Sequence, residues 1–237
     1  GTLVDRRHVL TAGHCAYGHD DGGWATEIVA VPAYSGESNA ATNRSTPFGA
    51  ARMVRILSNT LWVNSKNYDG DYALVSLDRP VGALTGYLGY GYNTDNNFFK
   101  TTTFYNNSYP GESPYNGLKM YERSGKFDAT TTYIASFNNK SYGGSSGSGS
   151  YFVQASGNRS VQTILSYGVV GKNVTGTVRL DPTRFGWFQD FIAENTPATV
   201  DLAAIKCRVS GQKVSGSQPV SLSVIVYNNS KLKFSGA

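Results

Sequence analysis

The sequence predicts an all-β fold, and three observations carry this prediction. The 237-residue chain holds 27 glycines and 16 tyrosines but only 16% charged residues, a composition typical of short strands joined by turns. Short apolar runs separated by turn-rich stretches continue from residue 1 to about residue 180. No repeat of fixed period is evident along them. The spacing of the runs is typical of a barrel or a sandwich, and the chain is long enough to bury a core.

Each apolar run is expected to form one strand. In chain order the runs are GTLV, HVLTA, TEIVAV, RMVRIL, YALVSL, TTYIASF, SYFVQ, QTILSYGV and GTVRL. A helix is predicted next, over residues 182–195, because Asp181 can cap the free N–H groups and Pro182 suits the first helical position. The apolar stripe that would dock this helix on the barrel consists of Phe185, Phe188, Phe191 and Ile192.

After Pro197 the sequence changes in character. The runs VDLAAIKCRV and PVSLSVIVYNN predict two strands around a polar turn. Two strands cannot bury a core of their own. We therefore expect residues 1–196 to form one domain and residues 197–237 to begin a second, β-sandwich-like domain that continues past this segment.

Composition and charge exclude several classes of function. The net charge of +5 is spread along the chain, without the run of basic residues interleaved with aromatics that a nucleic-acid groove requires. No apolar stretch approaches the ~18 residues of a membrane span. Two cysteines lack the spacing of a zinc site and are too few for a disulfide scaffold. We expect no nucleic acid, membrane span, metal or organic cofactor.

The first candidate catalytic residue is His14, in HVLTAGHC. An apolar strand that runs into a turn of small residues puts this imidazole at a strand end. A ring that titrates near neutrality can act there as a general base. An isolated histidine is more often an ordinary surface or core residue.

The second candidate is Asp71, which stands immediately before the apolar strand of DYALVSL. A partly buried aspartate needs a hydrogen-bonding partner, and the N–H of an imidazole is the partner that also fixes the tautomer of a catalytic histidine. A turn aspartate is the alternative interpretation, and Asp69 is a rival for the same role.

The third candidate is Ser146, in YGGSSGSGSYF. Glycines on both sides of a serine let the backbone turn tightly and aim successive N–H groups at one point, as an oxyanion hole needs. Gly144 stands two residues before this serine. By composition alone the segment would be a flexible linker, but a strand-like run follows it directly.

Together the three segments resemble the chymotrypsin-like serine peptidases. TAGHC is similar to the histidine signature of that family, Asp71 precedes an apolar strand, and Gly144-Ser145-Ser146-Gly147 is similar to the nucleophile loop. The order, the spacing and the GGxSGS form of the loop resemble most the bacterial glutamyl-endopeptidase-like branch. The resemblance covers residues 1 to about 195 and implies a double six-stranded antiparallel β-barrel whose first strands would precede Gly1.

The resemblance also implies a mechanism. His14 would take the proton of Ser146, Asp71 would orient the imidazole, and the N–H groups of Gly144 and Ser146 would stabilise the tetrahedral oxyanion. Ser148 is the rival nucleophile. Choosing it would put Ser146 where the family has the oxyanion-hole glycine, and a Cβ there would crowd the turn.

The substrate-binding residues that the resemblance implies are Lys140, Ser141, Leu165, Ser166, Tyr167, Gly168 and Gly176. Lys140 near the base of the pocket would favour an acidic substrate side chain, unless it is a solvated loop lysine. Ser141 matches a small hydroxyl residue of the glutamyl branch, whereas Leu165 replaces a histidine of that branch. We expect an acidic preference, with a small or apolar preference as the alternative.

The sequence thus predicts a secreted or cell-surface serine endopeptidase that acts on polypeptides as a monomer. The alternative is a catalytically inactive relative that serves as a protein-binding or adhesion module. A lipase-type α/β-hydrolase is disfavoured because its chain order is serine, acid, histidine. In many relatives the cysteine after the catalytic histidine pairs with one that would fall just before Gly1, so Cys15 is expected to lack that partner. Pairing with Cys207 stays open.

Overall fold

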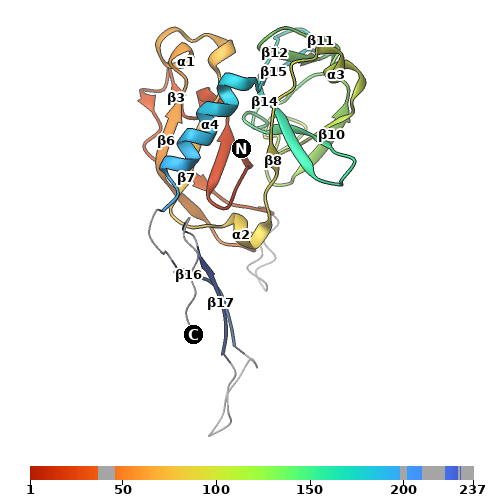
Figure 1. Cartoon of the computed structure of the whole chain (residues 1–237). Coiled ribbons are helices and arrows are strands. Elements are labelled where there is room, and N and C mark those ends of the chain that lie inside the picture. Colours follow the sequence, from red (N-terminus) through yellow and green to blue (C-terminus); the bar gives the residue numbers. More distant parts are fainter. Residues whose placement is uncertain (37–45, 198–201, 210–221, 229, 231–237) are drawn as a thin grey trace, which may run out of the picture.

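The computed structural model describes residues 1–36, 46–197, 202–209, 222–228 and 230. Two β-rich halves lie side by side, and helix α4 (Pro182–Glu194) lies across the first of them (Figure 1). Within the described residues, no helix has the length and apolar character needed to cross a membrane.

The first half is built on an antiparallel five-stranded sheet. In spatial order its strands are β1 (Thr2–Leu3), β2 (His8–Thr11), β7 (Ala73–Leu77), β6 (Ala51–Ser58) and β5 (Val29–Ala30). All residues of the central strand β7 are buried, because its apolar run is covered on both faces. A short hairpin, β3 (Tyr17–Gly18) with β4 (Gly23–Trp24), stands beside this sheet.

The second half is built on an eight-stranded sheet. Seven strands follow one path: β10 (Tyr121–Gly125), β9 (Phe104–Ser108), β13 (Gly149–Val153), β14 (Arg159–Gly168), β15 (Thr175–Arg179), β12 (Ile134–Phe137) and β11 (Ala129–Thr130). The eighth, β8 (Gly89–Tyr90), pairs with β14 in parallel. The apolar runs predicted as strands all fall on strands of these two sheets.

Five short helical segments were not predicted. They are η1 (Gly13–Cys15), α1 (Thr60–Ser65), η2 (Tyr68–Gly70), α2 (Gly82–Thr85) and α3 (Asn96–Thr101). None is long enough to show a helical period. Three of them nevertheless begin at a side chain that caps a free N–H: Asn59, Asn67 and Asp95.

The predicted C-terminal helix is confirmed and ends one residue early, at Glu194. Asp181 Oδ1 accepts the N–H of Arg184 at 2.9 Å, as expected of a cap. Phe188 and Phe191 are buried in a cluster with residues of both halves, including Leu74 and Ile164. The apolar stripe of α4 therefore holds the two halves together.

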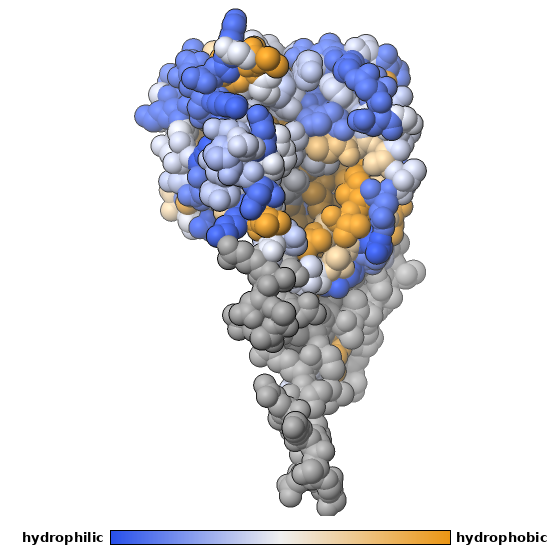
Figure 2. Space-filling model, turned by 180° about the vertical axis from the view of Figure 1, so that it is seen from behind, coloured by the Kyte–Doolittle hydropathy of each residue, from blue (hydrophilic) through white to orange (hydrophobic). Residues whose placement is uncertain are grey.

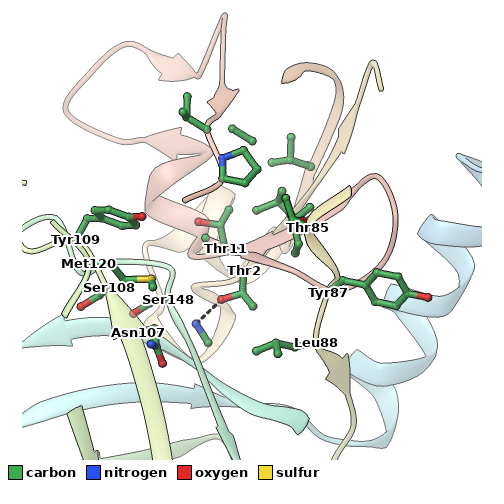
Figure 3. A pocket seen from close by; sticks show the side chains of 18 of the residues that line it. Thr2, Thr11, Thr85, Tyr87, Leu88, Asn107, Ser108, Tyr109, Met120 and Ser148 are labelled. Atoms are coloured by element: carbon green, nitrogen blue, oxygen red, sulfur yellow. Dashed lines mark hydrogen bonds between the residues drawn. The ribbon is translucent and has the colours of Figure 1, made fainter. Parts of the chain in front are cut away.

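The predicted all-β fold with two barrel-like halves is confirmed, and the two main sheets of the described residues contain five and eight strands. The edge strands of the five-stranded sheet, β1 and β5, both line an apolar groove of about 770 Å³. Figure 2 shows hydrophobic side chains in this hollow, and in Figure 3 side chains of both halves surround it. Across one end of the groove, Thr2 Oγ1 accepts the N–H of Gly149 at 2.9 Å (Figure 3). Among the described residues, β1 and β5 form the two edges of the five-stranded sheet.

The predicted C-terminal strands are present as β16 (Leu202–Val209) and β17 (Leu222–Asn228), which pair with each other in an antiparallel hairpin. Their assignment to a second domain, 197–237, stays a prediction. Cys15 is an exposed, free cysteine, so the expectation that it lacks a disulfide partner is confirmed and the alternative of a pairing with Cys207 is not realised.

Candidate active site

Antiparallel pairing of β2 with β7 brings His14 and Asp71 together. Thr11 at the end of β2 pairs with Ala73 at the start of β7. His14 lies in η1, three residues after the end of β2, and Asp71 lies two residues before the start of β7. Both side chains therefore stand at the same end of the first sheet.

Asp71 is completely buried and accepts three hydrogen bonds. Its Oδ1 accepts the backbone N–H of His14 at 2.7 Å, and its Oδ2 lies 2.9 Å from His14 Nδ1. The hydroxyl of Ser166, from β14 of the second half, also donates to Oδ2. A buried carboxylate requires such partners. The rival Asp69 is half-buried, and its carbonyl instead accepts from Arg184.

Asp71 determines the charge state of the imidazole. Burial alone would lower the pKa of His14, but the hydrogen bond and charge of Asp71, together with the neighbouring Cys15, raise the pKa to about 10. Cys15 is exposed, and although the surrounding protein desolvates its thiol in part, His14 holds the pKa of that thiol below its usual value. The site thus favours the imidazolium, the form that a general base reaches when it takes a proton.

The segment predicted either as a linker or as a nucleophile loop is an ordered turn before β13. Ser145 N–H donates to the carbonyl of Tyr142, and Gly147 N–H donates to that of Leu165. Gly144 and Gly147 have φ values of +89° and +76°, which favour glycine. A Cβ on Gly147 would lie 2.9 Å from Ala12 N. The turn therefore packs directly against the segment that carries His14.

Two N–H groups of this turn have no acceptor in the described part of the chain. The N–H groups of residues 143, 145, 147, 148 and 149 all donate within the protein. Among the described residues, none accepts from Gly144 N or Ser146 N. Free backbone donors two residues apart in a tight turn are a feature of oxyanion holes.

Of the two candidate nucleophiles, only Ser146 is accessible. Ser148 is buried, and its hydroxyl lies within hydrogen-bonding distance of two acceptors, the Ser145 carbonyl at 2.7 Å and Asn106 Oδ1 at 3.1 Å. Ser146 is partly exposed. In the described part of the chain no hydrogen bond joins Ser146 Oγ to His14, and such bonds are often long until a substrate is bound.

Beside Ser146 lies a cavity of about 460 Å³. Of the residues predicted to bind substrate, those that line it are Lys140, Ser141, Leu165, Ser166, Tyr167 and Gly168. Gly176 does not line it: this residue pairs with Tyr167 across β14 and β15, and the Tyr167 ring fills the space where its side chain would be. Glu112 and residues 169–174 line the cavity too, and no motif in the sequence pointed to them.

The cavity carries more positive than negative charge. Lys140 and Lys172 line it together with one carboxylate, Glu112. Lys140 Nζ lies 3.5 Å from Glu112 Oε1 and 4.7 Å from the centre of the Tyr142 ring. Lys140 is therefore an exposed lysine with two partners at the edge of the cavity.

Comparison with known proteins relates the first half of the chain to the trypsin family, whose model matches residues 1–107. A glutamyl endopeptidase of Bacillus licheniformis is 30% identical over 148 residues, which cover 62% of this chain and 43% of that protein. An extracellular metalloprotease of Bacillus subtilis is 36% identical over 96 residues, which cover 40% and 28%. The chain thus spans less than half the length of these curated relatives. Within its described residues, no group of three or more His, Cys, Asp or Glu could hold a metal ion.

Solved structures share the whole two-halved fold. A Glu endopeptidase in complex with MPD superposes with a TM-score of 0.67 at 20% identity, covering 81% of this chain and 84% of that one. The thermostable serine protease AL20 gives a TM-score of 0.64 at 21% identity, covering 82% and 88%. The protease Anisep from Arthrobacter nicotinovorans gives 0.63 at 22% identity, covering 82% and 85%. The chain therefore has the fold of these solved serine proteases, and it is similar in sequence to the trypsin family over residues 1–107 and to a glutamyl endopeptidase over 148 residues.

Proposed function

We propose that this chain is a serine endopeptidase with Ser146 as nucleophile, His14 as general base and Asp71 as the group that orients it. Ser146 Oγ attacks the peptide carbonyl carbon while His14 Nε2 takes the hydroxyl proton. The C–N bond then breaks, and the leaving amine receives that proton. Water, deprotonated by the same imidazole, hydrolyses the acyl-enzyme ester and returns the proton to Ser146.

The observation that carries this proposal is the buried Asp71 carboxylate, which takes both the backbone N–H and Nδ1 of His14. A hydrogen on Nδ1 leaves the Nε2 lone pair free to accept a proton. The free N–H groups of Gly144 and Ser146 give the developing oxyanion two donors. Preorganised donors of this kind supply much of the rate of acyl transfer.

We further propose a preference for an acidic side chain in the cavity beside Ser146. The excess of lysine over carboxylate there, and the Ser141 hydroxyl, would offer donors to a substrate carboxylate. Matched peptide anilides with Glu or Gln before the scissile bond test this, because the pair differs only in charge. The Glu substrate is expected to have the higher kcat/KM by about tenfold, equivalent to roughly 1.4 kcal/mol. Equal rates, or faster cleavage after Gln, would exclude the preference.

We also propose that the protein acts outside the cell on polypeptides, as a monomer. One relative is extracellular by its printed name. Peptidase activity in the culture medium, eluting at the size of one chain, would support this.

Labelling by a fluorophosphonate tests the proposed chemistry directly, because the probe phosphonylates only an activated serine. Wild type and Ser148→Ala are expected to be labelled, and Ser146→Ala is not. Circular dichroism verifies that each variant is folded. A folded wild type that resists the probe and cleaves no peptide would instead support the inactive binding or adhesion module.

A further inference from the structure

One loop of the second half holds the turn that carries Ser146. This loop, residues 109–117, is closed on itself by hydrogen bonds from Gly117 N to the Pro110 carbonyl and from Tyr115 N to the Glu112 carbonyl. Its Tyr115 ring packs on the ring of Tyr142, at 4.9 Å between centres.

Both polar backbone groups of Gly143 are bound by this loop. Glu112 Oε2 accepts the Gly143 N–H at 3.0 Å. The Gly143 carbonyl accepts the N–H of Gly111 at 2.7 Å and that of Glu112 at 3.3 Å. The Gly143 N–H is also the largest cause of the lowered pKa of the Glu112 carboxyl, ahead of the charge of Lys140. The two peptide planes that meet at Gly143 therefore have fixed orientations.

The planar peptide between Gly143 and Gly144 also fixes the direction of the Gly144 N–H. The carbonyl of Gly143 and the N–H of Gly144 belong to one planar trans peptide, so they point in opposite directions. Because the carbonyl points into the 109–117 loop, the N–H points away from it and keeps no acceptor among the described residues. A Cβ on Gly144 would lie 2.7 Å from the Tyr109 carbonyl and 2.8 Å from Gly111 N, so the approach of the loop requires glycine here.

We propose that Glu112 is a positioning residue for the oxyanion hole. Resting on the function proposed above, this inference says that the Glu112 carboxylate holds Gly143 in the orientation in which Gly144 N–H faces the substrate oxyanion. If the peptide between Gly143 and Gly144 rotated, it would present a carbonyl oxygen where a donor is needed. Glu112 acts through Gly143 and does not touch the substrate carbonyl.

The substitutions Glu112→Ala and Glu112→Gln separate the hydrogen bond from the charge. Gln keeps an oxygen that can accept the Gly143 N–H but loses the ion pair with Lys140, whereas Ala loses both. Glu194→Ala, at an exposed position of α4, serves as the matched control. Each variant is assayed with a peptide anilide for kcat and KM. Binding of a peptide boronate, whose adduct with Ser146 places an oxygen in the oxyanion hole, is compared with binding of the product peptide.

Loss of a whole oxyanion donor lowers kcat by about 10²–10³, so displacing one is expected to lower kcat about ten- to hundredfold in Glu112→Ala. Boronate affinity should fall by a similar factor, while KM and product affinity change less than about threefold. Glu112→Gln should keep a kcat at least about tenfold higher than that of Glu112→Ala, and Glu194→Ala should stay within about threefold of wild type. An unchanged kcat in Glu112→Ala, equal losses in the Ala and Gln variants, or a loss confined to KM would each overturn the inference.

Hydrogen exchange at the Gly143 amide, followed by NMR, tests the same contact without catalysis. Exchange is expected to be at least about tenfold faster in Glu112→Ala than in Glu112→Gln. Equal exchange in the two variants overturns the inference even in a protein without activity. A wild type that resists the fluorophosphonate contradicts the proposed function alone, so the two failures are distinguishable.

Discussion

Replacing Asp71 with asparagine should remove most activity while the protein stays folded. Asn has the same shape, and its oxygen can still accept the N–H of His14. Its amide nitrogen, placed 2.9 Å from His14 Nδ1, would donate to that atom and force the ring hydrogen onto Nε2. A ring protonated at Nε2 cannot take the proton of Ser146.

The size of the effect follows from these contacts. A wrong tautomer with intact geometry costs about 10⁴ in kcat, which corresponds to roughly 5 kcal/mol of transition-state stabilisation. The Ser166 hydroxyl loses a charged acceptor in a buried site, a loss of about 1–3 kcal/mol in folding stability. Activity should therefore fall far more than stability.

Steady-state kinetics with a peptide anilide between pH 5 and pH 11, together with urea unfolding, measure both quantities. In the wild type kcat/KM should rise with pH as His14 loses its proton, and the inflexion should lie well above 6.5 because the pKa of His14 is raised to about 10. Asp69→Asn, two residues away and without a hydrogen bond to His14, is the control and should stay within about twofold. If Asp71→Asn kept kcat/KM within tenfold of wild type, the proposed orientation of His14 would be wrong.

Three further predictions concern the surroundings of the triad. Ser166→Ala removes the hydroxyl that donates to Asp71 and should lower kcat/KM about five- to tenfold, measured with the same anilide; an unchanged value would mean that this bond plays no part in orienting the carboxylate. Gly147→Ala should lower the free energy of unfolding, measured in urea, by about 2 kcal/mol or more, because the residue has φ +76° and the new Cβ would lie 2.9 Å from Ala12 N. The control Gly157→Ala, at φ +84° but in open space, should lower it less. The raised pKa of His14 means that, between pH 6.5 and about pH 10, the folded state binds a proton that the unfolded state has lost. The protonated imidazole therefore contributes fully to folding stability below pH 6.5, and this contribution vanishes as the pH rises through 10. In a Cys15→Ser background, the difference in unfolding free energy between His14 and His14→Asn should shrink from pH 7 to pH 10, and a difference that grows would refute the raised pKa.

The strands that coincide with an apolar run bounded by turn residues were predictable. For example, YALVSL contains β7, and all of QTILSYGV except its last residue lies in β14. Six short or polar strands, β3, β4, β8, β9, β10 and β11, were not predicted. The helix at 182–194 was also predictable, since its cap and its stripe lie within one segment. The short helices were not predictable from periodicity, although Asn59 and Asp95 carried cap signals. The strand counts of the two sheets, five and eight, could not be predicted from the apolar runs. Which strands pair at a sheet edge depends on the whole tertiary arrangement.

The candidate site was only partly predictable. His14, Asp71 and Ser146 each stood in a segment with a local signal, and the structure brings His14 and Asp71 into direct contact. Glu112 had no signal, because its contact with Gly143 joins residues from two loops 31 positions apart. Gly176 was expected to line the substrate cavity, but it lies beneath the Tyr167 ring, a detail of strand register that the sequence does not reveal.

The site lies where the two halves meet, and this explains why its parts cannot be treated separately. His14 and Asp71 come from the first half, whereas Ser146 and Ser166 come from the second. Three contacts cross the junction close to the chemistry: Ser166 to Asp71, Thr2 to Gly149, and Gly147 against Ala12. Each ties a backbone or carboxylate of one half to a neighbour of a proposed catalytic residue in the other. A change that shifts one half against the other therefore moves Ser146 relative to His14, and displacements of about 1 Å are enough to lose a hundredfold in rate.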